Sequence, residues 1–322
     1  MEISMKITVI GCGRWGSLIT WYLDKIGQEV TLYGRKDSEH MQRFMHERKN
    51  DLLELPLSVE LTNELDVVIQ SEIIVISINS QGLQSLMDEL KPLHIQNKVI
   101  VLCMKGIEIS SGRRLTQIVN DNLDFSNEVA VWLGPGHVQE FYRGVPNCMV
   151  IDSKNEQVKK LLVESFSSDL IRFYYGQDLI GNEIGAAAKN VIGIAAGMLD
   201  GLGLSSLKGA LMSRGTREIA RLIKAMGGNE LSAYGLCHLG DYEATVFSQY
   251  SHNRRFGEAF VKKEKFDKLA EGYYTVKAIV SLGKNYGVDL PICMAVYEIL
   301  YREKDAPETL NGLFTRSIKC EF

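Results

Sequence analysis

The chain has 322 residues and a formal net charge of −4, with 45% hydrophobic and 24% charged residues. This length exceeds one ordinary hydrophobic core and predicts two domains. The acidic balance gives no electrostatic reason to expect nucleic acid as a partner, and no segment is apolar enough to predict a membrane span. The six cysteines show no CxxC spacing, so we expect reduced thiols, no metal site and, with no basic apolar leader, a cytoplasmic protein.

A glycine motif follows the first predicted strand. Met5–Ile10 is a short β-branched run, and the sequence Gly11-Cys12-Gly13-Arg14-Trp15-Gly16 comes directly after it as G-x-G-x-x-G. Ser17–Ile26 continues as a helix, and Glu29–Tyr33 is the second strand. In this context the motif predicts dinucleotide binding, because Gly11 permits the tight turn, Gly13 lets the backbone approach a pyrophosphate, and Gly16 allows close helix–strand packing.

The end of the second strand bears on which dinucleotide is bound. An NAD site usually carries an acid there that holds the ribose 2′-hydroxyl. Here Tyr33-Gly34 is followed by Arg35 and Lys36, two cations suited to a 2′-phosphate, which favours NADP. Asp37 lies one residue further on, so NAD stays open, and a solvated charge pair on a loop is the alternative interpretation.

The remainder of the first half alternates strands and helices. We predict helices over His40–Arg48, Leu83–Leu90 and Arg113–Asn120, and strands over Asp66–Ile69, Ile73–Ile78, Lys98–Cys103, Val129–Leu133, Asn147–Ile151 and Ile171–Tyr175. This alternation predicts an α/β domain with a parallel, doubly wound Rossmann sheet. Ligands of such sheets gather at the carboxyl ends of strands, where Asn79, Lys105 and Gly134–His137 fall.

From Ile180 onward the periodicity is helical. The predicted helices are Glu183–Met198, Leu207–Met226, Glu230–Cys237, Arg254–Val261, Tyr274–Tyr286 and Ile292–Tyr301. We therefore predict a Rossmann domain over residues 1–178 and an all-helical substrate domain over residues 179–322.

Lys189 is the basic side chain inside the apolar helix that opens this second half. The composition of Gly181–Gly203 predicts burial on all sides. At helical spacing the lysine is flanked by small residues, Gly185 and Ala186 before it and Gly193 and Ala196 after it, which leave room for a ligand or another backbone. Because burial penalises a charged lysine, such a group is a candidate general acid/base. The alternative is a structural lysine that snorkels or pairs with Glu183.

Several patches, in this order along the chain, resemble one family. They are the GxGxWG turn at Gly11–Gly16, Met104-Lys105-Gly106, Gly134-Pro135, Ala187–Ile192, Leu239-Gly240-Asp241, the NRRFG patch at Asn253–Gly257, Glu271-Gly272-Tyr273 and Leu290-Pro291-Ile292. The chain resembles the NAD(P)-dependent glycerol-3-phosphate dehydrogenases, in particular their bacterial branch, over nearly its whole length.

The resemblance implies an oxidoreductase that interconverts dihydroxyacetone phosphate and sn-glycerol 3-phosphate, serving glycerophospholipid metabolism. Lys189 would be the general acid/base, Lys105 would hold substrate and cofactor, and Asp241 would orient the reacting group or a lysine. The implied cofactor contacts are Gly11, Gly13, Arg14, Trp15, Gly16, Arg35, Lys36, Lys105, Val138, Arg254 and Glu271. The implied contacts to a small phosphorylated substrate are Lys105, Gly134, Gly136, Lys189, Asp241, Thr245, Ser251, His252, Asn253 and Arg254.

The chain departs from the family pattern around the substrate end. His252 stands where the family usually has an arginine that binds phosphate, so either Arg254 takes over or phosphate binding is weaker and depends on pH. The segment after Asp241 lacks the usual LxxTC, the proline usual near Asn79 is missing, and Gly136 replaces a common serine or threonine.

Two other functions stay open at this point. One is a dehydrogenase of the same fold acting on a different hydroxy or keto substrate, which the altered substrate-side residues favour and the NRRFG patch opposes. The other is a non-catalytic protein that senses dinucleotides, which the presence of both Lys105 and Lys189 opposes. The apolar helical half is compatible with a homodimer.

Overall fold

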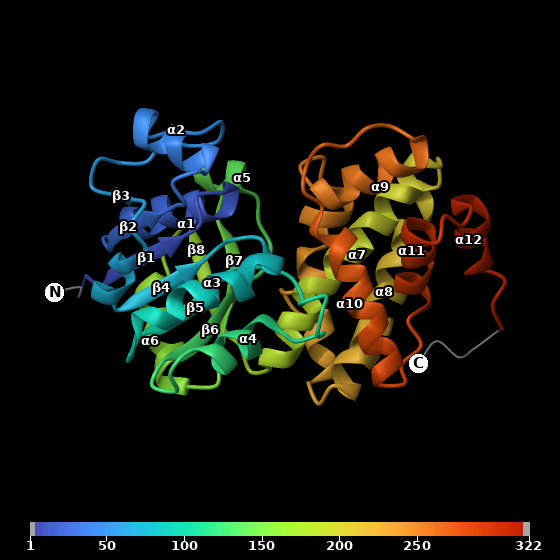
Figure 1. Cartoon of the computed structure of the whole chain (residues 1–322). Coiled ribbons are helices and arrows are strands. Elements are labelled where there is room, and N and C mark those ends of the chain that lie inside the picture. Colours follow the sequence, from blue (N-terminus) through green and yellow to red (C-terminus); the bar gives the residue numbers. More distant parts are fainter. Residues whose placement is uncertain (1–3, 318–322) are drawn as a thin grey trace. The chain divides into compact units, whose positions relative to one another are not determined.

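The structure is a computed structural model that describes residues 4–317 (Figure 1). The chain divides into two compact units. The first comprises the chain through Lys105 together with Arg113–Leu179, and the second comprises Gly106–Gly112 together with the chain from Ile180 onward.

The first unit is built on one sheet of eight strands in the order β3-β2-β1-β4-β5-β6-β7-β8. The strands are β1 (Lys6–Ile10), β2 (Glu29–Tyr33), β3 (Glu60–Thr62), β4 (Ile73–Ile76), β5 (Val99–Leu102), β6 (Glu128–Leu133), β7 (Asn147–Ser153) and β8 (Ile171–Tyr175). Neighbouring strands are parallel except β6 and β7, where Val131 pairs with Asp152 in antiparallel register. The strand order reverses direction between β1 and β4, the place where doubly wound sheets bind ligands.

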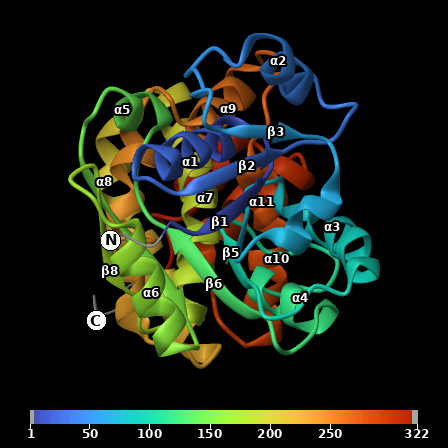
Figure 2. The ribbon, with the colours of Figure 1, turned by 90° about the vertical axis from the view of Figure 1, so that its left-hand side faces the viewer.

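Helices cover both faces of this sheet. They are α1 (Arg14–Lys25), α2 (Glu39–Glu47), α3 (Leu83–Leu90), α4 (Leu115–Asn122), α5 (Val138–Tyr142) and α6 (Glu156–Phe166). Figure 2 places α3 and α4 on one side of the sheet and α1 and α6 on the other. On the latter side Trp132 is buried among aromatic rings, with ring centroids 5.9 Å from Tyr22 and 4.9 Å from Phe173. These apolar contacts hold the sheet and thereby the loops at its carboxyl edge.

The second unit is helical. Its helices are α7 (Leu179–Gly201), α8 (Lys208–Ala225), α9 (His252–Lys262), α10 (Glu271–Asn285), α11 (Pro291–Tyr301) and α12 (Ala306–Gly312). Helix α7 is buried without interruption from Gly181 to Leu199, so it is the central helix. Figure 1 shows α8, α9, α10 and α11 around it, with α12 on the outer side of α11. The Rossmann fold followed by a helical C-terminal part is therefore confirmed.

Three predicted features are wrong. Asp66–Ile69 is not a strand but part of a 3₁₀ helix, Leu65–Gln70, in which only Val68 is buried. Glu230–Cys237 is not an α-helix, because the 3₁₀ helix that Asn229 caps ends at Tyr234, before Gly235. The sheet is not parallel throughout, since β7 and β8 run opposite to the other strands.

Several elements of the structure have no counterpart among the predictions. Helices α5, α6 and α12 and strand β3 are among them, and so is a π-helix over Glu243–Phe247. Five cysteines of the described chain, Cys12, Cys103, Cys148, Cys237 and Cys293, are free thiols, and Cys320 lies outside the described residues. Among residues 4–317, no helix combines the length and apolarity needed to cross a membrane.

Candidate active site

The glycine turn after β1 has the geometry that its sequence requires. Gly11 has φ +115°, and a Cβ atom there would lie 2.2 Å from the carbonyl oxygen of Ser77. A Cβ on Gly16 would lie 1.9 Å from the carbonyl oxygen of Gly11, so helix α1 starts in direct contact with the turn. Gly13 precedes α1, and a Cβ there would meet nothing within 4 Å. Gly11 and Gly16 are thus packed against other backbone atoms, whereas the space at Gly13 is open. This open space lies in front of the N-terminus of α1, where a phosphate would be favoured.

Arg14 and Trp15 belong to the first turn of α1. Arg14 Nη2 lies 3.4 Å from Gln139 Oε1, and burial lowers the pKa of its guanidinium. The Trp15 ring packs at 6.0 Å from Phe141, and its Nε1 is buried without a hydrogen-bond partner. The Trp15 side chain therefore supports the turn by packing, and a cofactor contact at this residue would come from its backbone.

The cations after β2 lie at the surface of the sheet unit. Arg35 Nη2 forms an ion pair of 2.7 Å with Glu89 Oε1 on α3, and both side chains remain largely exposed. The Lys36 carbonyl accepts a hydrogen bond from Gln42 on α2. A Cβ on Gly34 would lie 2.7 Å from the Met41 side chain, so glycine there lets α2 pack against the end of β2.

Lys105 and Gly134 meet at the ends of two adjacent strands. Lys105 Nζ donates a 2.6 Å hydrogen bond to the carbonyl oxygen of Gly134. Gly134 and Gly136 have φ of +134° and +145°, values that favour glycine. The Val138 side chain is buried in the sheet core, so a contact from this residue to a cofactor would also involve its backbone.

Lys189, Asp241 and Thr245 come together inside the helical unit. Lys189 Nζ lies 2.9 Å from Asp241 Oδ2 and donates a 2.7 Å hydrogen bond to Thr245 Oγ1. All three residues are buried, with Asp241 and Thr245 each 1% exposed. Asp241 ends a 3₁₀ helix and Thr245 lies in the π-helix that follows it. The buried ammonium of Lys189 thus has its charge balanced by a carboxylate and its position fixed by two oxygen atoms.

The small residues around Lys189 allow these neighbours to come close. A Cβ on Gly193 would lie 2.6 Å from Thr245 Cγ2, and a Cβ on Gly185 would lie 3.0 Å from His238 Cβ. The space that the sequence left open next to Lys189 on α7 is therefore filled from two directions by other segments of the same unit.

His238 is a buried, neutral histidine. Its Nδ1 lies 2.8 Å from the Gly185 carbonyl oxygen, and its Nε2 lies 2.7 Å from the hydroxyl of Tyr242. Because a carbonyl can only accept, Nδ1 carries the proton and Nε2 accepts from the tyrosine. Burial, with the nearby charge of Lys189, lowers the pKa of His238 to about 4. His238 therefore supports the loop that carries Asp241.

The N-terminus of α9 carries the polar residues of the NRRFG patch. Ser251 caps the helix, with its hydroxyl 3.3 Å from the backbone nitrogen of Arg254. His252 Nδ1 lies 3.2 Å from the Leu269 carbonyl oxygen. Asn253 donates from Nδ2 to Asn190 Oδ1 at 3.0 Å, and its Oδ1 accepts from the Gly272 backbone at 2.9 Å.

Asn253 therefore connects α9 to α7 and α10. Glu271, the residue before Gly272, is the first residue of α10. Asn190 was not singled out in the sequence as a site residue, although it directly follows Lys189. The contact between these two asparagines joins residues far apart in the chain, and no local pattern indicates it.

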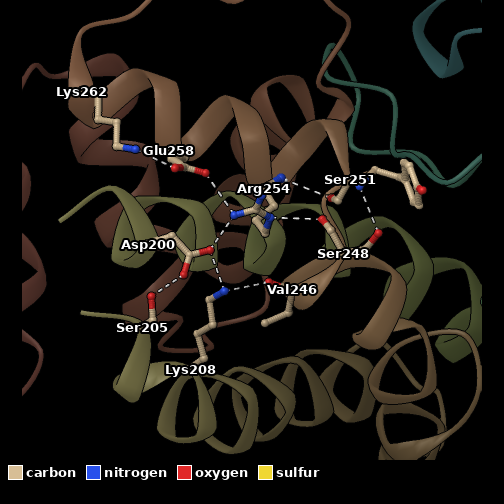
Figure 3. Close-up of polar contacts among 10 residues, drawn as sticks. Asp200, Ser205, Lys208, Val246, Ser248, Ser251, Arg254, Glu258 and Lys262 are labelled. Carbon is tan, nitrogen blue, oxygen red and sulfur yellow. Dashed lines mark hydrogen bonds and ion pairs between the residues drawn. The ribbon is translucent and has the colours of Figure 1, made fainter. Parts of the chain in front are cut away.

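The Arg254 guanidinium is held by acidic side chains (Figure 3). Its Nη1 lies 2.7 Å from Asp200 Oδ2 and 3.1 Å from Glu258 Oε2, and its Nε donates to the Ser248 carbonyl oxygen. Lys208 reaches the same Asp200 oxygen at 2.6 Å. Burial opposes ionisation of Asp200, but the hydrogen bonds that it accepts outweigh burial and lower its pKa. Asp200, at the end of α7, thus joins Arg254 of α9 to Lys208 of α8. The sequence did not indicate Asp200, Lys208 or Glu258.

Comparisons with known proteins agree along the whole chain. The model of the NAD-dependent glycerol-3-phosphate dehydrogenase N-terminus matches residues 6–159, and the model of the C-terminus of the same family matches residues 178–311. A protein of a Thermoanaerobacter species named glycerol-3-phosphate dehydrogenase [NAD(P)+] is 33% identical, with 99% of both chains covered. The chain belongs to the NAD-dependent glycerol-3-phosphate dehydrogenase family.

Two further relatives agree with this assignment. A protein of the same name from Fusobacterium nucleatum is 34% identical, again with 99% of both chains covered. The crystal structure of glycerol-3-phosphate dehydrogenase from Coxiella burnetii is 28% identical and superimposes with a TM-score of 0.90, covering 97% of this chain and 99% of that one. The match extends through both units of the chain, so both units belong to this one family.

Within this glycerol-3-phosphate dehydrogenase family member, the departures from the expected pattern have local structural reasons. At Gly136, where the resemblance predicts serine or threonine, a Cβ would lie 2.1 Å from the Phe141 ring, so a larger residue would require that ring to move. Asn79, where a proline was expected nearby, caps the next turn by accepting from the Gln81 backbone at 3.0 Å. The altered segment after Asp241 forms the π-helix that brings Thr245 to Lys189.

Proposed function

We propose that this chain is an NAD(P)-dependent glycerol-3-phosphate dehydrogenase that interconverts dihydroxyacetone phosphate and sn-glycerol 3-phosphate, with Lys189 as general acid/base. Family membership over the full chain supports the reaction. The assignment of Lys189 rests on one observation. Its ammonium group is buried on an apolar helix and is held by Asp241 and Thr245. A sensor of dinucleotides has no need for such a proton donor.

Lys189 moves one proton in this reaction. As the carbonyl of dihydroxyacetone phosphate is reduced, its oxygen gains negative charge, and a positioned acid that delivers a proton stabilises that charge. Lys189 Nζ supplies this proton and becomes a neutral amine, and in the reverse direction the amine takes the proton from the hydroxyl. Asp241 Oδ2, 2.9 Å from Nζ, holds the amine in place.

The glycine turn and the residues after it fit a dinucleotide. The open space at Gly13, in front of the N-terminus of α1, suits the pyrophosphate. The bound nicotinamide supplies the hydride. Arg14, Trp15, Val138 and Glu271 are further proposed cofactor contacts. Arg35 and Lys36 are proposed to bind a 2′-phosphate, so we propose NADP as the preferred cofactor with NAD also used.

Two sets of groups would hold the substrate. On the sheet unit, Lys105 and the backbone at Gly134 and Gly136 are proposed contacts. On the helical unit, Ser251, His252 and Asn253 lie at the N-terminus of α9, whose backbone N–H groups and positive dipole end favour a phosphate. Arg254 was predicted to hold this phosphate directly. Its guanidinium already contacts Asp200 and Glu258, so we propose that Arg254 acts by fixing α9.

Other expectations from the sequence stay predictions. The domain boundary at residue 178, the homodimer, the absence of a nucleic-acid partner and the cytoplasmic location are of this kind. Sedimentation analysis of the purified chain measures the homodimer directly.

The experiment that tests the proposed function is a comparison of initial rates. Oxidation of NADPH and of NADH is followed with dihydroxyacetone phosphate and, separately, with unphosphorylated dihydroxyacetone. We expect turnover with the phosphorylated ketone and a far lower rate without the phosphate. Lys189→Ala should lower kcat by about 10²–10⁴-fold, the usual contribution of general acid–base catalysis, while leaving cofactor affinity unchanged.

Lys224→Ala is the matched control, because Lys224 is an exposed lysine of the same unit, paired with Glu230 at 2.9 Å. It should retain the wild-type rate. Tight cofactor binding without turnover of either ketone would overturn the substrate assignment, and full activity of Lys189→Ala would overturn the role of Lys189.

A further inference from the structure

A cavity of about 670 Å³ lies in the helical unit, and none of the proposed reaction residues lines it. Its walls come from α7, α8, α12 and the start of α11, with Leu199, Leu211, Leu310 and Leu313 among the apolar residues. This size is in the range of small-molecule sites, which bury most of their ligand between apolar walls.

One face of α8 gives the cavity a positive rim. Arg214, Arg217 and Arg221 follow one another at three- and four-residue spacing, so they project from the same side of the helix, and all three line the cavity. Arg316 adds a fourth guanidinium after α12. Four arginines thus gather around an apolar pocket.

Two acidic residues share this cavity, and both are already engaged. Glu218 accepts from the backbone nitrogens of Ile292 and Cys293 at 2.9 and 3.0 Å, so its carboxylate caps the start of α11. Asp289 receives Arg316 on its carboxylate at 2.6 Å and Arg221 on its carbonyl oxygen at 2.8 Å. Among the residues that line the cavity, four arginines thus outnumber two acidic residues.

We infer that this cavity binds a single-chain amphipathic anion, with its hydrocarbon chain between α8 and α12 and its carboxylate or phosphate head at the arginines. The ligand needs a hydrocarbon chain because a small inorganic anion would leave the apolar walls of the cavity uncovered. The guanidinium groups explain the need for an anion, because arginine binds carboxylate and phosphate through paired hydrogen bonds. Ala195 and Leu199 of α7 form part of the wall, so the ligand touches the helix that carries Lys189.

Calorimetric titration of the purified full chain tests this inference without using enzyme activity. The probes, kept below their micelle concentrations, are dodecanoate and dodecyl phosphate, which distinguish the two head groups. Inorganic phosphate and the neutral dodecyl maltoside are the reference compounds. We expect saturable binding of at least one chain-bearing anion and none of either reference compound.

Two variants locate the site. Arg214→Glu should weaken binding by about tenfold or more, in line with the loss of a charged hydrogen bond. Ala210 lines the cavity at an exposed position of α8. Ala210→Trp should therefore fill part of the cavity and weaken binding without overpacking the hydrophobic core. Arg302→Glu is the matched control, since Arg302 is an exposed arginine of the same unit that does not line the cavity.

Binding of neither anion by the wild type would overturn the inference, and so would equal affinity for dodecyl maltoside. Unchanged affinity in Arg214→Glu and Ala210→Trp, with both variants folded by circular dichroism, would overturn the location. Because these titrations do not depend on turnover, their failure would leave the proposed reaction unaffected.

Discussion

A Cβ atom on Gly197 would lie 1.8 Å from the carbonyl oxygen of Arg254, so helix α9 packs directly on the backbone of α7 at this point. Gly193 and Gly201, one helical turn to either side, are also in contact with residues of α9 or the segment before it. This row of glycines sets the distance between Lys189 on α7 and the N-terminus of α9.

Gly197→Ala should therefore force the two helices apart. We expect a loss of about 2 kcal/mol in the free energy of unfolding, as for other overpacked cores, and a higher KM for the phosphorylated ketone, because the start of α9 moves. Urea unfolding and initial rates measure the two effects. Gly209→Ala in α8 is the control, since a Cβ there meets nothing within 4 Å, and it should gain up to about 1 kcal/mol from helix propensity. Equal effects of the two substitutions would contradict the packing argument.

Asp241→Asn should lower the free energy of unfolding, because it leaves the buried charge of Lys189 without its carboxylate partner. Lys189 and Asp241 are both buried and 2.9 Å apart, and removing one partner of such a pair costs about 3–5 kcal/mol. We expect Asp241→Asn to lower both stability and kcat. Adding Lys189→Met should restore part of the stability but none of the activity. Urea unfolding of the single and double variants measures the coupling, and strictly additive losses would show that the two side chains do not act as a pair.

His252→Arg should strengthen binding of the substrate phosphate at alkaline pH. A histidine loses its charge near neutrality, whereas arginine keeps its charge throughout. The ratio of KM in the wild type to KM in His252→Arg should thus rise from pH 6 to pH 8.5, by about tenfold if one charged hydrogen bond is lost. The substrate's own ionisation is common to both proteins and cancels in this ratio. A ratio that does not change with pH would mean that His252 does not contact the phosphate.

Much of the first unit could be predicted from the sequence because its signals are local. The turn at Gly11–Gly16 combines a steric need for glycine with a strand before it and a helix after it. By contrast, the segment Asp66–Ile69 has the β-branched composition of a strand, yet it forms a 3₁₀ helix in which only Val68 is buried. The reversal at β7 likewise depends on how strands pair across the sheet, which their own residues do not specify.

In the helical unit, the sequence indicated Lys189 and Asp241 as site residues, but it did not indicate the side chains that contact them. The resemblance implied that Thr245 contacts the substrate, and in the structure its hydroxyl lies 2.7 Å from Lys189 Nζ. Arg254 was expected to hold phosphate, and its interactions with Asp200 and Glu258 could not be foreseen. These contacts join residues distant in the chain, and helical periodicity carries no information about them.

Arg35→Asp should move cofactor preference toward NADH. An acid at the end of β2 repels a 2′-phosphate and binds the ribose hydroxyls of NADH. The ratio of kcat/KM for NADPH to that for NADH should fall by about tenfold or more. Glu89→Gln tests the same idea in the other direction, because it removes the 2.7 Å ion pair that competes for Arg35, and should raise the ratio. Arg43→Asp, on α2 with a side chain that is 40% exposed, is the charge-matched control and should leave the ratio unchanged. Unchanged ratios in both Arg35→Asp and Glu89→Gln would refute the role of Arg35.

Glu218→Gln should change how stability depends on pH. Burial raises the pKa of Glu218 from 4.5 to about 7, so the folded state binds its proton more tightly than the unfolded state, and this carboxyl makes stability fall as pH rises through that window. Burial lowers the pKa of His238 from 6.5 to about 4, so the imidazole makes stability rise with pH over nearly the same window. Each shift corresponds to about 3 kcal/mol, and the two slopes should largely cancel in the wild type.

Removing either group should reveal the slope of the other. In Glu218→Gln, the free energy of unfolding should rise between about pH 4 and 6.5, whereas in His238→Asn it should fall between about pH 4.5 and 7. The sign of the slope is the test, because both variants lose hydrogen bonds and should be less stable than the wild type at every pH. Urea unfolding at half-unit pH steps gives these slopes. Parallel curves for the wild type and both variants would show that neither group titrates differently in the folded and unfolded states.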